Sequence, residues 1–478
     1  MPVGADAMRP LYVDLDGTLI ATDSLHESLL QLVRDAPASL LSLPGWLLRG
    51  KAALKREVAQ RTALDVQTLP YRPEVLELVR SARAAGRRTV LATASDGKLA
   101  CAVASHLGMF DAVLASDGKH NLRGAGKRAA IEADANGQGF SYAGNDHADL
   151  AVWRGAEAAV VVSRSEALAR QVARMTTVEA RIVPPRPSLR RFLYGARLHQ
   201  WLKNVLIFLP LMPVLHDLTE PIVLHALLAF VAFGLMASGI YVLNDLLDLQ
   251  SDRRHRRKRL RPFAAGEFSA QGGLVMAALL CAASLTLSLA LLPIAFVGVL
   301  LSYMALTCAY SLFLKRRAVV DVFALAGLYT IRLAAGTSAT GLPLSFWILS
   351  FSMFIFLSLA LAKRYVELTG PPLEAQRMKR DRGYQPGDLS FVLCTGVAAG
   401  QMSALLLGLY LHDQEMMARY DNPEYLWVLV PLFLFWILRV WLKAIRGALH
   451  DDPVVFAARD WVSHWSMGIA ALALWAAD

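Results

Sequence analysis

Cysteine is scarce in this chain of 478 residues: it occurs four times, at scattered positions, and never as a CxxC pair. This spacing suggests neither a disulfide framework nor a zinc site. A secretory signal peptide is not apparent either, because Asp14 and Asp16 interrupt the first apolar stretch. We therefore expect the start of the protein to be cytoplasmic.

Charge is also sparse, with 18% charged residues against 55% hydrophobic ones. Together with a mean hydropathy of +0.40, this balance is rare in soluble globular proteins and predicts a polytopic membrane protein. The net charge of +10 is compatible with nucleic acid, anionic lipid or phosphorylated substrates as partners. Because Lys and Arg gather at the ends of apolar runs, the last two are favoured and no nucleic-acid partner is expected.

The first part of the sequence has the pattern of a soluble α/β domain. Short β-prone runs at 11–13, 89–91 and 159–162 alternate with helical segments rich in Ala and Arg. The proline-rich stretch 182–187 is typical of a stiff linker. We predict an α/β domain over 8–178, a linker over 179–196 and a membrane domain over 197–478.

Nine apolar runs follow and are predicted to be transmembrane helices. Lys and Arg are frequent before the first run and after the even-numbered runs, whereas the other connections have few. The positive-inside rule then predicts a multi-pass inner (cell) membrane protein with its N-terminus and motif-bearing loops cytoplasmic and its C-terminus outside. The runs lie at about 202–216, 222–243, 272–292, 294–313, 319–337, 344–362, 389–411, 425–443 and 460–476.

Two aspartates follow the first β-prone run, in Asp14-Leu15-Asp16-Gly17-Thr18. At the end of a strand, Asp14 could attack a phosphorus atom and form an aspartyl-phosphate. Asp16 could protonate the leaving alcohol and afterwards activate water. Both could also help to hold Mg²⁺, Asp14 through its side chain and Asp16 through its backbone.

This stretch resembles the first motif of the haloacid-dehalogenase-like (HAD) phosphatase superfamily, and the resemblance extends over the whole first half. It implies a Rossmann-like fold with a small helical cap at about 22–72. Thr93 matches the hydroxyl residue that binds phosphate in this family, and Lys127 matches the lysine that neutralises it.

The last, acidic motif departs from the family pattern GDxxxD. Asn145 stands where the first acid is usual, unless Asp146 has taken over, and Asp149 keeps the second position. The resemblance implies that these residues contribute to a Mg²⁺ site, with weaker affinity because Asn brings no charge. The alternatives are a decayed phosphatase kept as a docking module and a P-type ion pump. Pumps resemble DKTGT, with Lys where this chain has Asp16, which argues against a pump.

A second acidic stretch follows the second apolar run. On a helix, Asn244, Asp248 and Asp252 recur at i, i+4 and i+8, with Asp245 close by, so that oxygen ligands stack along one face. A loop rich in Lys and Arg follows at 253–261. Oxygen ligands beside cations suit Mg²⁺ carrying a phosphorylated substrate. The alternative is a basic patch for anionic lipid with merely solvated acids; the helical spacing of the acids favours the metal site.

Several polar side chains lie within or at the ends of the apolar runs. Such groups are costly in a bilayer and usually face a cavity or a partner. Interfacial anchoring or snorkelling would explain any one of them alone, but all gather at the same predicted membrane edge as the acidic stretch. The candidate substrate-binding residues of this group are Lys203, Tyr310, Lys315, Asp321, Arg332, Lys363 and Arg364.

The pattern NDxxDxxxD ahead of a basic loop, in a chain of nine predicted helices, resembles the UbiA superfamily of intramembrane transferases. The resemblance covers about 190–478 and is closest to polyprenyl-phosphate phosphoribosyltransferases, on the stretches QWxKN, DRxHxxKRxRPxAAG, YSxxLK and KRYxEL. Arg256 departs from the HPxKR of that branch. Aromatic prenyltransferases have a second acidic motif, DxxxD, which is only half present because Leu325 stands four residues after Asp321.

The resemblance implies transfer of 5-phosphoribose from phosphoribosyl diphosphate to a polyprenyl phosphate, giving a cell-wall arabinan precursor. The acidic stretch would hold Mg²⁺ on the diphosphate, with Asp248 and Asp252 as the catalytic aspartates. Lys203, Lys258 and Arg261 would stabilise the charge on the leaving group. The HAD-like domain would remove the 5-phosphate of the product. Prenylation of an aromatic quinone precursor, or a non-catalytic scaffold or transporter with a phosphate-sensing domain, are the alternatives.

Overall fold

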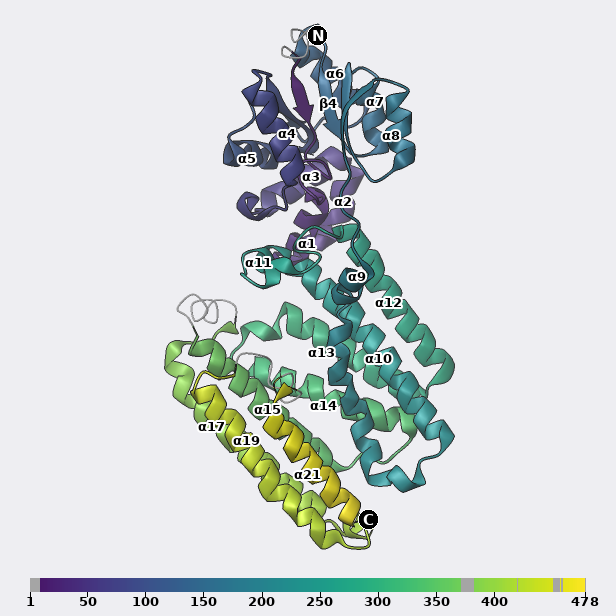
Figure 1. Cartoon of the computed structure of the whole chain (residues 1–478), viewed down its shortest axis with the longest axis vertical. Coiled ribbons are helices and arrows are strands. Elements are labelled where there is room, and N and C mark those ends of the chain that lie inside the picture. Colours follow the sequence, from purple (N-terminus) through teal and green to yellow (C-terminus); the bar gives the residue numbers. More distant parts are fainter. Residues whose placement is uncertain (1–8, 371–381, 419, 450–455, 457–458, 478) are drawn as a thin grey trace. The chain divides into compact units, whose positions relative to one another are not determined.

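The computed structural model describes residues 9–370, 382–418, 420–449, 456 and 459–477. The chain divides into two compact units, whose elements are labelled in Figure 1. The segment that carries the acidic stretch belongs to the same unit as the first half of the chain. Unit 1 consists of Met1–Arg197 and Tyr241–Ala277, and unit 2 of Leu198–Ile240 and Ala278–Asp478.

Unit 1 is built around a parallel sheet of six strands in the order β3-β2-β1-β4-β5-β6. The α/β prediction is confirmed, because parallel strands joined by helices are the pattern of a Rossmann-like fold. The last strand reaches Ile182 and so includes the first residues of the predicted linker. The strands are β1 (Leu11–Val13), β2 (Thr89–Asp96), β3 (Ala112–Ser116), β4 (Ser141–Gly144), β5 (Ala158–Val162) and β6 (Thr177–Ile182).

The central strands are continuous apolar runs because helices cover both faces of the sheet. Successive residues of β1 point to opposite faces, so Leu11 and Val13 join one core and Tyr12 the other. Helices α4 (Pro73–Ala84) and α5 (Gly97–Leu107) pack on the first core. Helices α6 (Ala125–Ala135), α7 (Leu150–Trp153) and α8 (Glu166–Ala173) pack on the second.

Between β1 and α4 the chain forms a small set of helices within the predicted cap range, 22–72. Asp23 begins the first of them, because its carboxylate accepts hydrogen bonds from two N–H groups of the first turn. Trp46 packs beside Leu32 and Val58 in the cap's own core. The cap elements are α1 (Ser24–Asp35), η2 (Pro37–Ser42), α2 (Leu43–Leu48), α3 (Lys51–Arg61) and η3 (Val66–Thr68).

The spacing of the acids in unit 1 predicts one unbroken helix, but the structure differs from this prediction. The helix is interrupted at Asp248, whose φ of −99° and ψ of 9° lie in the bridge region. The N–H of Asp248 still donates to the carbonyl of Asn244, and the N–H of Asp252 to that of Asp248. The i, i+4, i+8 hydrogen bonding therefore persists through the interruption. Unit 1 here contains α9 (Leu189–Gly195), α11 (Leu249–Arg253) and η6 (Lys258–Leu260), together with residues 241–247 of α10 (Glu220–Leu247) and 270–277 of α12 (Ala270–Leu291). The remaining residues of α10 and α12 belong to unit 2.

Unit 2 is all-helical, and glycine permits close contact between its helices. Gly396 lies under the ring of Trp441, and Gly400 lies against Ile437 and Ser358. The elements are η5 (Leu198–Asp217), α13 (Ile294–Leu312), η7 (Leu314–Arg316), α14 (Val320–Thr340), α15 (Phe346–Leu368), η8 (Pro386–Asp388), α17 (Leu389–Leu411), α18 (Gln414–Met417), η9 (Pro423–Val428), α19 (Leu429–Ile445) and α21 (Trp461–Ala477).

Seven helices within the described part of the chain are long and apolar enough to cross a membrane. They correspond to the second to the eighth predicted runs. The first run forms the 3₁₀ segment η5, in which Pro210 supplies no N–H and Val214 departs from helical φ and ψ. The last run forms α21, which has 17 residues. The count of nine transmembrane helices therefore remains a prediction.

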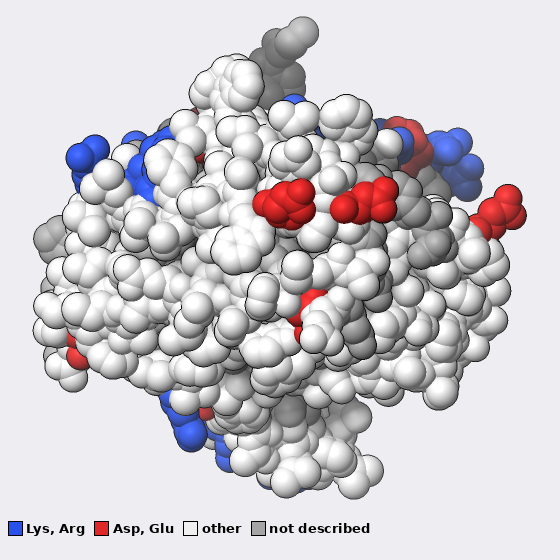
Figure 2. All heavy atoms as spheres, turned by 90° about the horizontal axis from the view of Figure 1, so that it is seen from below, with Lys and Arg blue, Asp and Glu red and all other residues white. Residues whose placement is uncertain are grey.

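The surface of these helices and of α21 is rich in apolar side chains. Large hydrophobic side chains such as Leu279, Leu289 and Trp475 are exposed on α12 and α21. Figure 2 looks onto the end of the molecule at which the C-terminus lies, and this face is largely uncharged. It carries some acidic residues, while Lys and Arg show only towards its margins. The apolar surface and the seven spans indicate an integral membrane protein.

Candidate active sites

The first candidate site lies at the carboxyl end of β1, where Asp14 is the first residue after the strand. The Asp14 carboxylate lies 2.9 Å from Nζ of Lys127, and the Asp149 carboxylate lies 3.6 Å from the same nitrogen. All three side chains are buried. The parallel sheet brings these predicted site residues together, because Lys127 lies in the first turn of α6 and Asp149 follows β4.

Tyr142, a residue of β4 that no motif singles out, connects this group. Its hydroxyl accepts a hydrogen bond from Lys127 Nζ (2.9 Å) and donates one to Asp149 Oδ1 (2.7 Å). The other oxygen of Asp149 accepts from the N–H groups of Asn145 and Asp146, at 3.0 and 3.1 Å. In the sequence, Tyr142 cannot be distinguished from a core aromatic residue because it lies in a fully buried strand.

The side chains of Asn145 and Asp146 have different surroundings. Asn145 Oδ1 accepts a hydrogen bond from the Thr18 hydroxyl at 3.2 Å. The same side chain lies against Gly17, whose φ of +71° and lack of a Cβ both suit this close approach. Asp146 is exposed and accepts from the N–H of His147 at 2.6 Å, which caps the following turn. Asn145 therefore faces the Asp14 loop, whereas Asp146 has a structural role in this turn.

Oxygen donors for a metal ion are present beside Asp14. Among the residues that the structure describes, no group of three or more His, Cys, Asp and Glu side chains is arranged to hold a metal. The Asp14 and Asp149 carboxylates and the Asn145 amide nevertheless form a set of oxygen atoms, which Mg²⁺ prefers. The donor set fits Mg²⁺. Because Asn145 replaces a carboxylate, the set carries one negative charge fewer than three carboxylates would.

Asp16 is oriented towards the cap. Its carboxylate accepts hydrogen bonds from the N–H of Ser24, at 2.7 Å, and from the hydroxyl of Ser95. The two serine hydroxyls are 2.9 Å apart. Thr93, the predicted phosphate-binding residue, is fully buried, and its hydroxyl accepts the N–H of Ser95 at 3.0 Å. Ser95 follows Thr93 by two positions on β2, so both side chains point to the same face of the strand. This spacing was the signal in the sequence that could have identified Ser95 as a site residue.

Burial changes the acidity of both aspartates. It raises the pKa of Asp14 to about 7, although the Lys127 ammonium acts in the opposite direction. Burial also raises the pKa of Asp16, and the neighbouring Asp23 carboxylate raises it further. A raised pKa suits Asp16 as a general acid, because a group must hold its proton before it can donate it.

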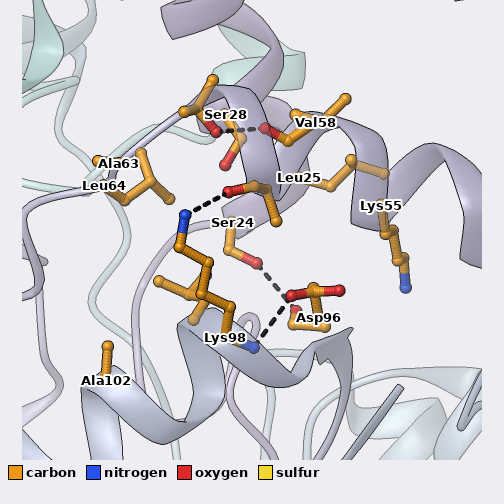
Figure 3. Close-up of a pocket in the computed structure, with 14 residues that line it drawn as sticks. Ser24, Leu25, Ser28, Lys55, Val58, Ala63, Leu64, Asp96, Lys98 and Ala102 are labelled. Atoms are coloured by element: carbon orange, nitrogen blue, oxygen red, sulfur yellow. Dashed lines mark hydrogen bonds between the residues drawn. The ribbon is translucent and has the colours of Figure 1, made fainter. Parts of the chain in front are cut away.

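Ser24 and Ser95, which both bond to Asp16, line a pocket of about 200 Å³ between the cap and the sheet. Figure 3 shows residues that line this pocket. Lys98 extends from α5 towards the cap and donates from Nζ to the carbonyl of Ala59 at 3.0 Å. Lys55 of α3 donates to the carbonyl of Ala94 at 2.6 Å, and burial lowers the pKa of Lys55. The pocket is lined by Ser24, Leu25, Ser28, Lys55, Val58, Ala59, Thr62, Ala63, Leu64, Ser95, Asp96, Lys98, Leu99 and Ala102. Its mixed lining suits an alcohol that carries a further anionic group.

The second candidate site is the acidic stretch of unit 1, where arginines neutralise the acids. Arg197 contacts both oxygens of Asp245, one of them at 2.9 Å from Nε. Arg261 Nη1 donates to Asp245 at 3.2 Å and to Asp252 at 2.6 Å. Both aspartates are buried. Arg261 therefore joins two predicted metal ligands, and Arg197 is a partner that the motifs do not identify.

The other members of this stretch are more accessible. Asn244 and Asp248 are half-buried, and Arg34 Nη1 lies 3.5 Å from Asp248. Lys258 lies in η6 and is exposed. Burial raises the pKa of Asp252, against the effect of the Arg261 guanidinium. The carboxylates that contact arginine here are also suitable ligands for Mg²⁺. The residues of this site therefore fit a Mg²⁺ ion that carries a diphosphate.

In unit 2, Asp321 and Arg364 form a buried ion pair. Arg364 Nε donates to Asp321 at 2.7 Å, and both side chains are essentially inaccessible to solvent. Tyr384 donates to the other Asp321 oxygen at 2.7 Å. Arg364 also donates to Glu367 at 2.5 Å and contacts the hydroxyl of Tyr310 at 3.4 Å. Asp321 is thus fully engaged by protein groups, as expected of a structural carboxylate.

Arg332 belongs to a separate cluster. Its Nε donates to Asn204 Oδ1 at 3.0 Å, and its guanidinium lies 5.3 to 5.5 Å from the ring centroids of Phe233, Tyr303 and Tyr329. The amide nitrogen of Asn204 is buried without a hydrogen-bond partner. These contacts of Arg332 differ from those of Asp321, which bonds to Arg364 and Tyr384, although the spacing of Asp321 and Arg332 predicts a common helical face.

An apolar groove of about 670 Å³ lies close to this cluster within unit 2. Lys203, whose Nζ lies 5.6 Å from the ring centroid of Tyr329, is among its lining residues. Lys315 in η7 and Lys363 in α15 are half-buried. The groove is lined by Leu202, Lys203, Val205, Leu206, Phe356, Leu407, Leu429, Leu432, Phe433, Trp436, Ser463, His464, Ser466, Met467 and Ala470. A cation at an apolar groove suits a lipid with an anionic head group.

Comparison with known proteins identifies both parts of the chain. Residues 209–467, more than half of the sequence, match the UbiA prenyltransferase family. The chain belongs to this family. Residues 11–154 match haloacid dehalogenase-like hydrolases, so a HAD-like domain precedes the UbiA domain.

Relatives of this UbiA-family chain fall into two groups. The uncharacterized protein y4nM of Sinorhizobium fredii is 40% identical over 469 residues, covering 97% of this chain and 90% of the relative. Nodulation protein NoeC of Azorhizobium caulinodans is 35% identical over 270 residues, covering 56% of this chain and 86% of the relative. Decaprenyl-phosphate phosphoribosyltransferase of Mycobacterium tuberculosis is 32% identical over 284 residues, covering 58% and 90%. Only the first of these three extends through both domains.

Motifs in this UbiA-family chain locate charged residues better than the neutral residues that hold them. Ser24, Tyr142 and Tyr384 each bond to a predicted site carboxylate, yet the motifs mark none of them as a site residue. Arg197 lies three residues before Gln200, the first residue of the QWxKN stretch, and its charge at a helix end was an available signal. Tyr384 offered none, because a tyrosine in a loop between apolar runs is common.

Proposed function

We propose that the UbiA domain transfers 5-phosphoribose from phosphoribosyl diphosphate to a polyprenyl phosphate, and that the HAD-like domain then removes the 5-phosphate. The observation that carries the first step is the relative named decaprenyl-phosphate phosphoribosyltransferase, which the chain matches over 90% of that protein's length. The buried Asp321–Arg364 pair supports it, since an aromatic prenyltransferase needs a second acidic cluster free to bind metal.

The acidic stretch binds the diphosphate in this proposal. Mg²⁺, when bound, would neutralise the leaving diphosphate and act as a Lewis acid towards it. Asn244, Asp248 and Asp252 would hold it, with Asp245 assisting. Arg261, which already joins Asp245 and Asp252, would turn to the diphosphate as the bond from C1 to oxygen breaks. Lys258 is exposed on the same loop and would add a further positive charge.

In this proposal the lipid substrate binds to unit 2. Its polyprenyl chain would lie in the apolar groove. Lys203, which the sequence assigns to the leaving group, lines this groove and would bind the lipid phosphate instead, with Lys315 and Lys363 as further cations. A phosphate oxygen of the lipid attacks C1 of the ribose, and diphosphate leaves. No general base is required, because that oxygen is already ionised at neutral pH.

The HAD-like domain completes the sequence of reactions. Asp14 attacks the 5-phosphate, Asp16 donates its proton to the leaving ribose oxygen, and Asp16 then takes a proton from the water that hydrolyses the aspartyl-phosphate. Lys127 offsets the charge on Asp14 and on the phosphoryl oxygens. Asp14, Asn145 and Asp149 would hold Mg²⁺, which would supply electrostatic stabilisation of the phosphoryl group.

We also infer the orientation of the chain in the inner (cell) membrane. The N-terminal domain and the acidic stretch would be cytoplasmic and the C-terminus outside. The distribution of Lys and Arg between alternate connections supports this orientation, as does the scarcity of basic residues on the face in Figure 2.

The test uses the full-length chain in lipid nanodiscs with Mg²⁺, phosphoribosyl diphosphate and a polyprenyl phosphate. The Asp14→Asn variant should accumulate the 5-phosphorylated lipid, whereas the parent should release the lipid without that phosphate. Mass spectrometry distinguishes the two products. An identical product ratio for parent and variant would show that the HAD-like domain does not act on this lipid.

A further inference from the structure

One face of the cap helix α1 has no role in the proposed phosphatase chemistry. Glu27, Leu30, Gln31 and Arg34 recur at i, i+3, i+4 and i+7, so they lie along a single side of the helix. Within unit 1, all four contact the segment that contains the acidic stretch. A helix of an ordinary isolated cap would expose such a face to water.

At the centre of this contact, Glu27 and Arg253 form a buried two-pronged ion pair. Arg253 Nη1 and Nη2 donate to the two Glu27 oxygens at 2.7 and 2.6 Å. The side chains are only 2% and 4% exposed. Arg253 Nε donates to the carbonyl of Ala264 at 2.9 Å, which fixes the guanidinium within its own loop. Either charge alone would be buried without compensation, so each residue requires the other.

Apolar contacts surround the ion pair. Leu30 is buried in a cluster with Val242, Leu246 and Phe263. On the other side, Gly266 has a φ of +74°, and a Cβ there would lie 2.9 Å from Pro70 Cβ and 3.0 Å from Ala21 Cβ. The loop therefore approaches the cap backbone at a position where only glycine fits without displacement.

Polar contacts lie at the edge of the same surface. Arg254 Nη2 lies 2.8 Å from Asp65, and Gln250 Nε2 donates to Gln31 Oε1 at 3.1 Å. Arg34 Nη1 lies 3.5 Å from Asp248, a proposed metal ligand. A buried charge pair, an apolar cluster and a polar edge are the composition of a specific interface.

We propose that this face of α1 is a docking surface whose partner is the chain's own segment 242–266. Docking holds the HAD-like domain beside the acidic stretch, so that a phosphorylated product formed there meets the Asp14 site at high local concentration. The existence of the docking surface is independent of the chemistry proposed above; its effect on product release rests on that proposed function.

The structural test uses cross-linking in the full-length chain. Gln31→Cys and Gln250→Cys are introduced after replacement of the four native cysteines by alanine, together with a specific protease site at residues 184–187. After treatment with a short bismaleimide and cleavage, the two fragments should remain joined. Glu27→Arg and Arg253→Glu should each reduce joining at least tenfold, and the double variant with exchanged charges should restore it. Arg254→Glu, at an exposed pair, is the matched control and should change joining less than twofold.

The functional test measures the same variants by two activities. Hydrolysis of a small soluble phosphate ester should be unchanged in all of them, which shows that the HAD-like domain is folded. With phosphoribosyl diphosphate and polyprenyl phosphate, the single variants should release several times more 5-phosphorylated lipid, and the exchanged pair should reverse this rise.

Distinct outcomes separate the two proposals. Equal cross-linking in every variant, or none in the parent, would overturn the docking surface. Cross-linking that follows the charges in a chain that forms no ribosylated lipid would support docking and overturn the proposed function. Cross-linking that follows the charges without a change in the lipid product would support the contact and overturn its role in product transfer.

Discussion

Asn145 and Asp146 stand next to each other in the last HAD motif, but only Asn145 faces the Asp14 loop. Asn145→Ala should raise the Mg²⁺ concentration for half-maximal phosphatase activity about tenfold, equivalent to ~1.4 kcal/mol, because an oxygen donor is lost. Asp146→Asn should change it less than twofold, since asparagine caps a helical turn as well as aspartate does. Titration of activity with Mg²⁺ measures both. A larger effect at Asp146 would contradict the metal assignment.

The Asp321–Arg364 pair is the most deeply buried ion pair among the contacts described here. Asp321→Asn should lower the free energy of unfolding by about 3 kcal/mol, because Arg364 would lose one buried carboxylate and keep only Glu367 as a charged partner. Combining it with Arg364→Met should recover part of this loss, and Tyr384→Phe alone should cost about 1 kcal/mol. Unfolding in mixed micelles by added denaturing detergent measures the series. A double variant less stable than Asp321→Asn would contradict the pairing.

At the scale of the element, the packing of α17 depends on glycine. A side chain at Gly396 would overlap the Trp441 ring of α19, whereas nothing lies within 4 Å of a Cβ added at Gly298 of α13. Gly396→Leu should therefore destabilise the membrane domain by about 1–3 kcal/mol through overpacking, and Gly298→Leu should not. Thermal unfolding followed by tryptophan fluorescence compares the two. Equal midpoints would contradict this account of helix contact.

Elements differ in how well the sequence predicts them, for physical reasons. Strand β1 and the seven apolar spans follow from local patterns, namely buried runs and length, and the structure contains them. The segment η5 does not, because Pro210 and neighbouring residues disrupt a helix that hydropathy alone predicts. The interruption at Asp248 is equally invisible in a sequence whose acids keep helical spacing.

At the scale of the whole molecule, sequence reasoning finds two domains and their motifs but not what connects them within unit 1. Glu27 appears in the sequence as an ordinary surface acid of a helix. Its partner, Arg253, lies 226 residues away in a run of basic residues in which no single member stands out. Motifs report local chemistry, whereas a long-range ion pair is defined only by folding.

The central claim, that phosphoribosyl diphosphate and a polyprenyl phosphate are the substrates, is tested most directly by mass spectrometry of the lipid product. The full-length chain is incubated with Mg²⁺ and both compounds, and in parallel with a prenyl diphosphate and an aromatic acid. The account predicts a polyprenyl-phosphoryl-ribose in the first reaction, no prenylated acid in the second, and loss of product in Asp248→Ala. A prenylated aromatic product, or undiminished ribosylation by Asp248→Ala, would contradict it.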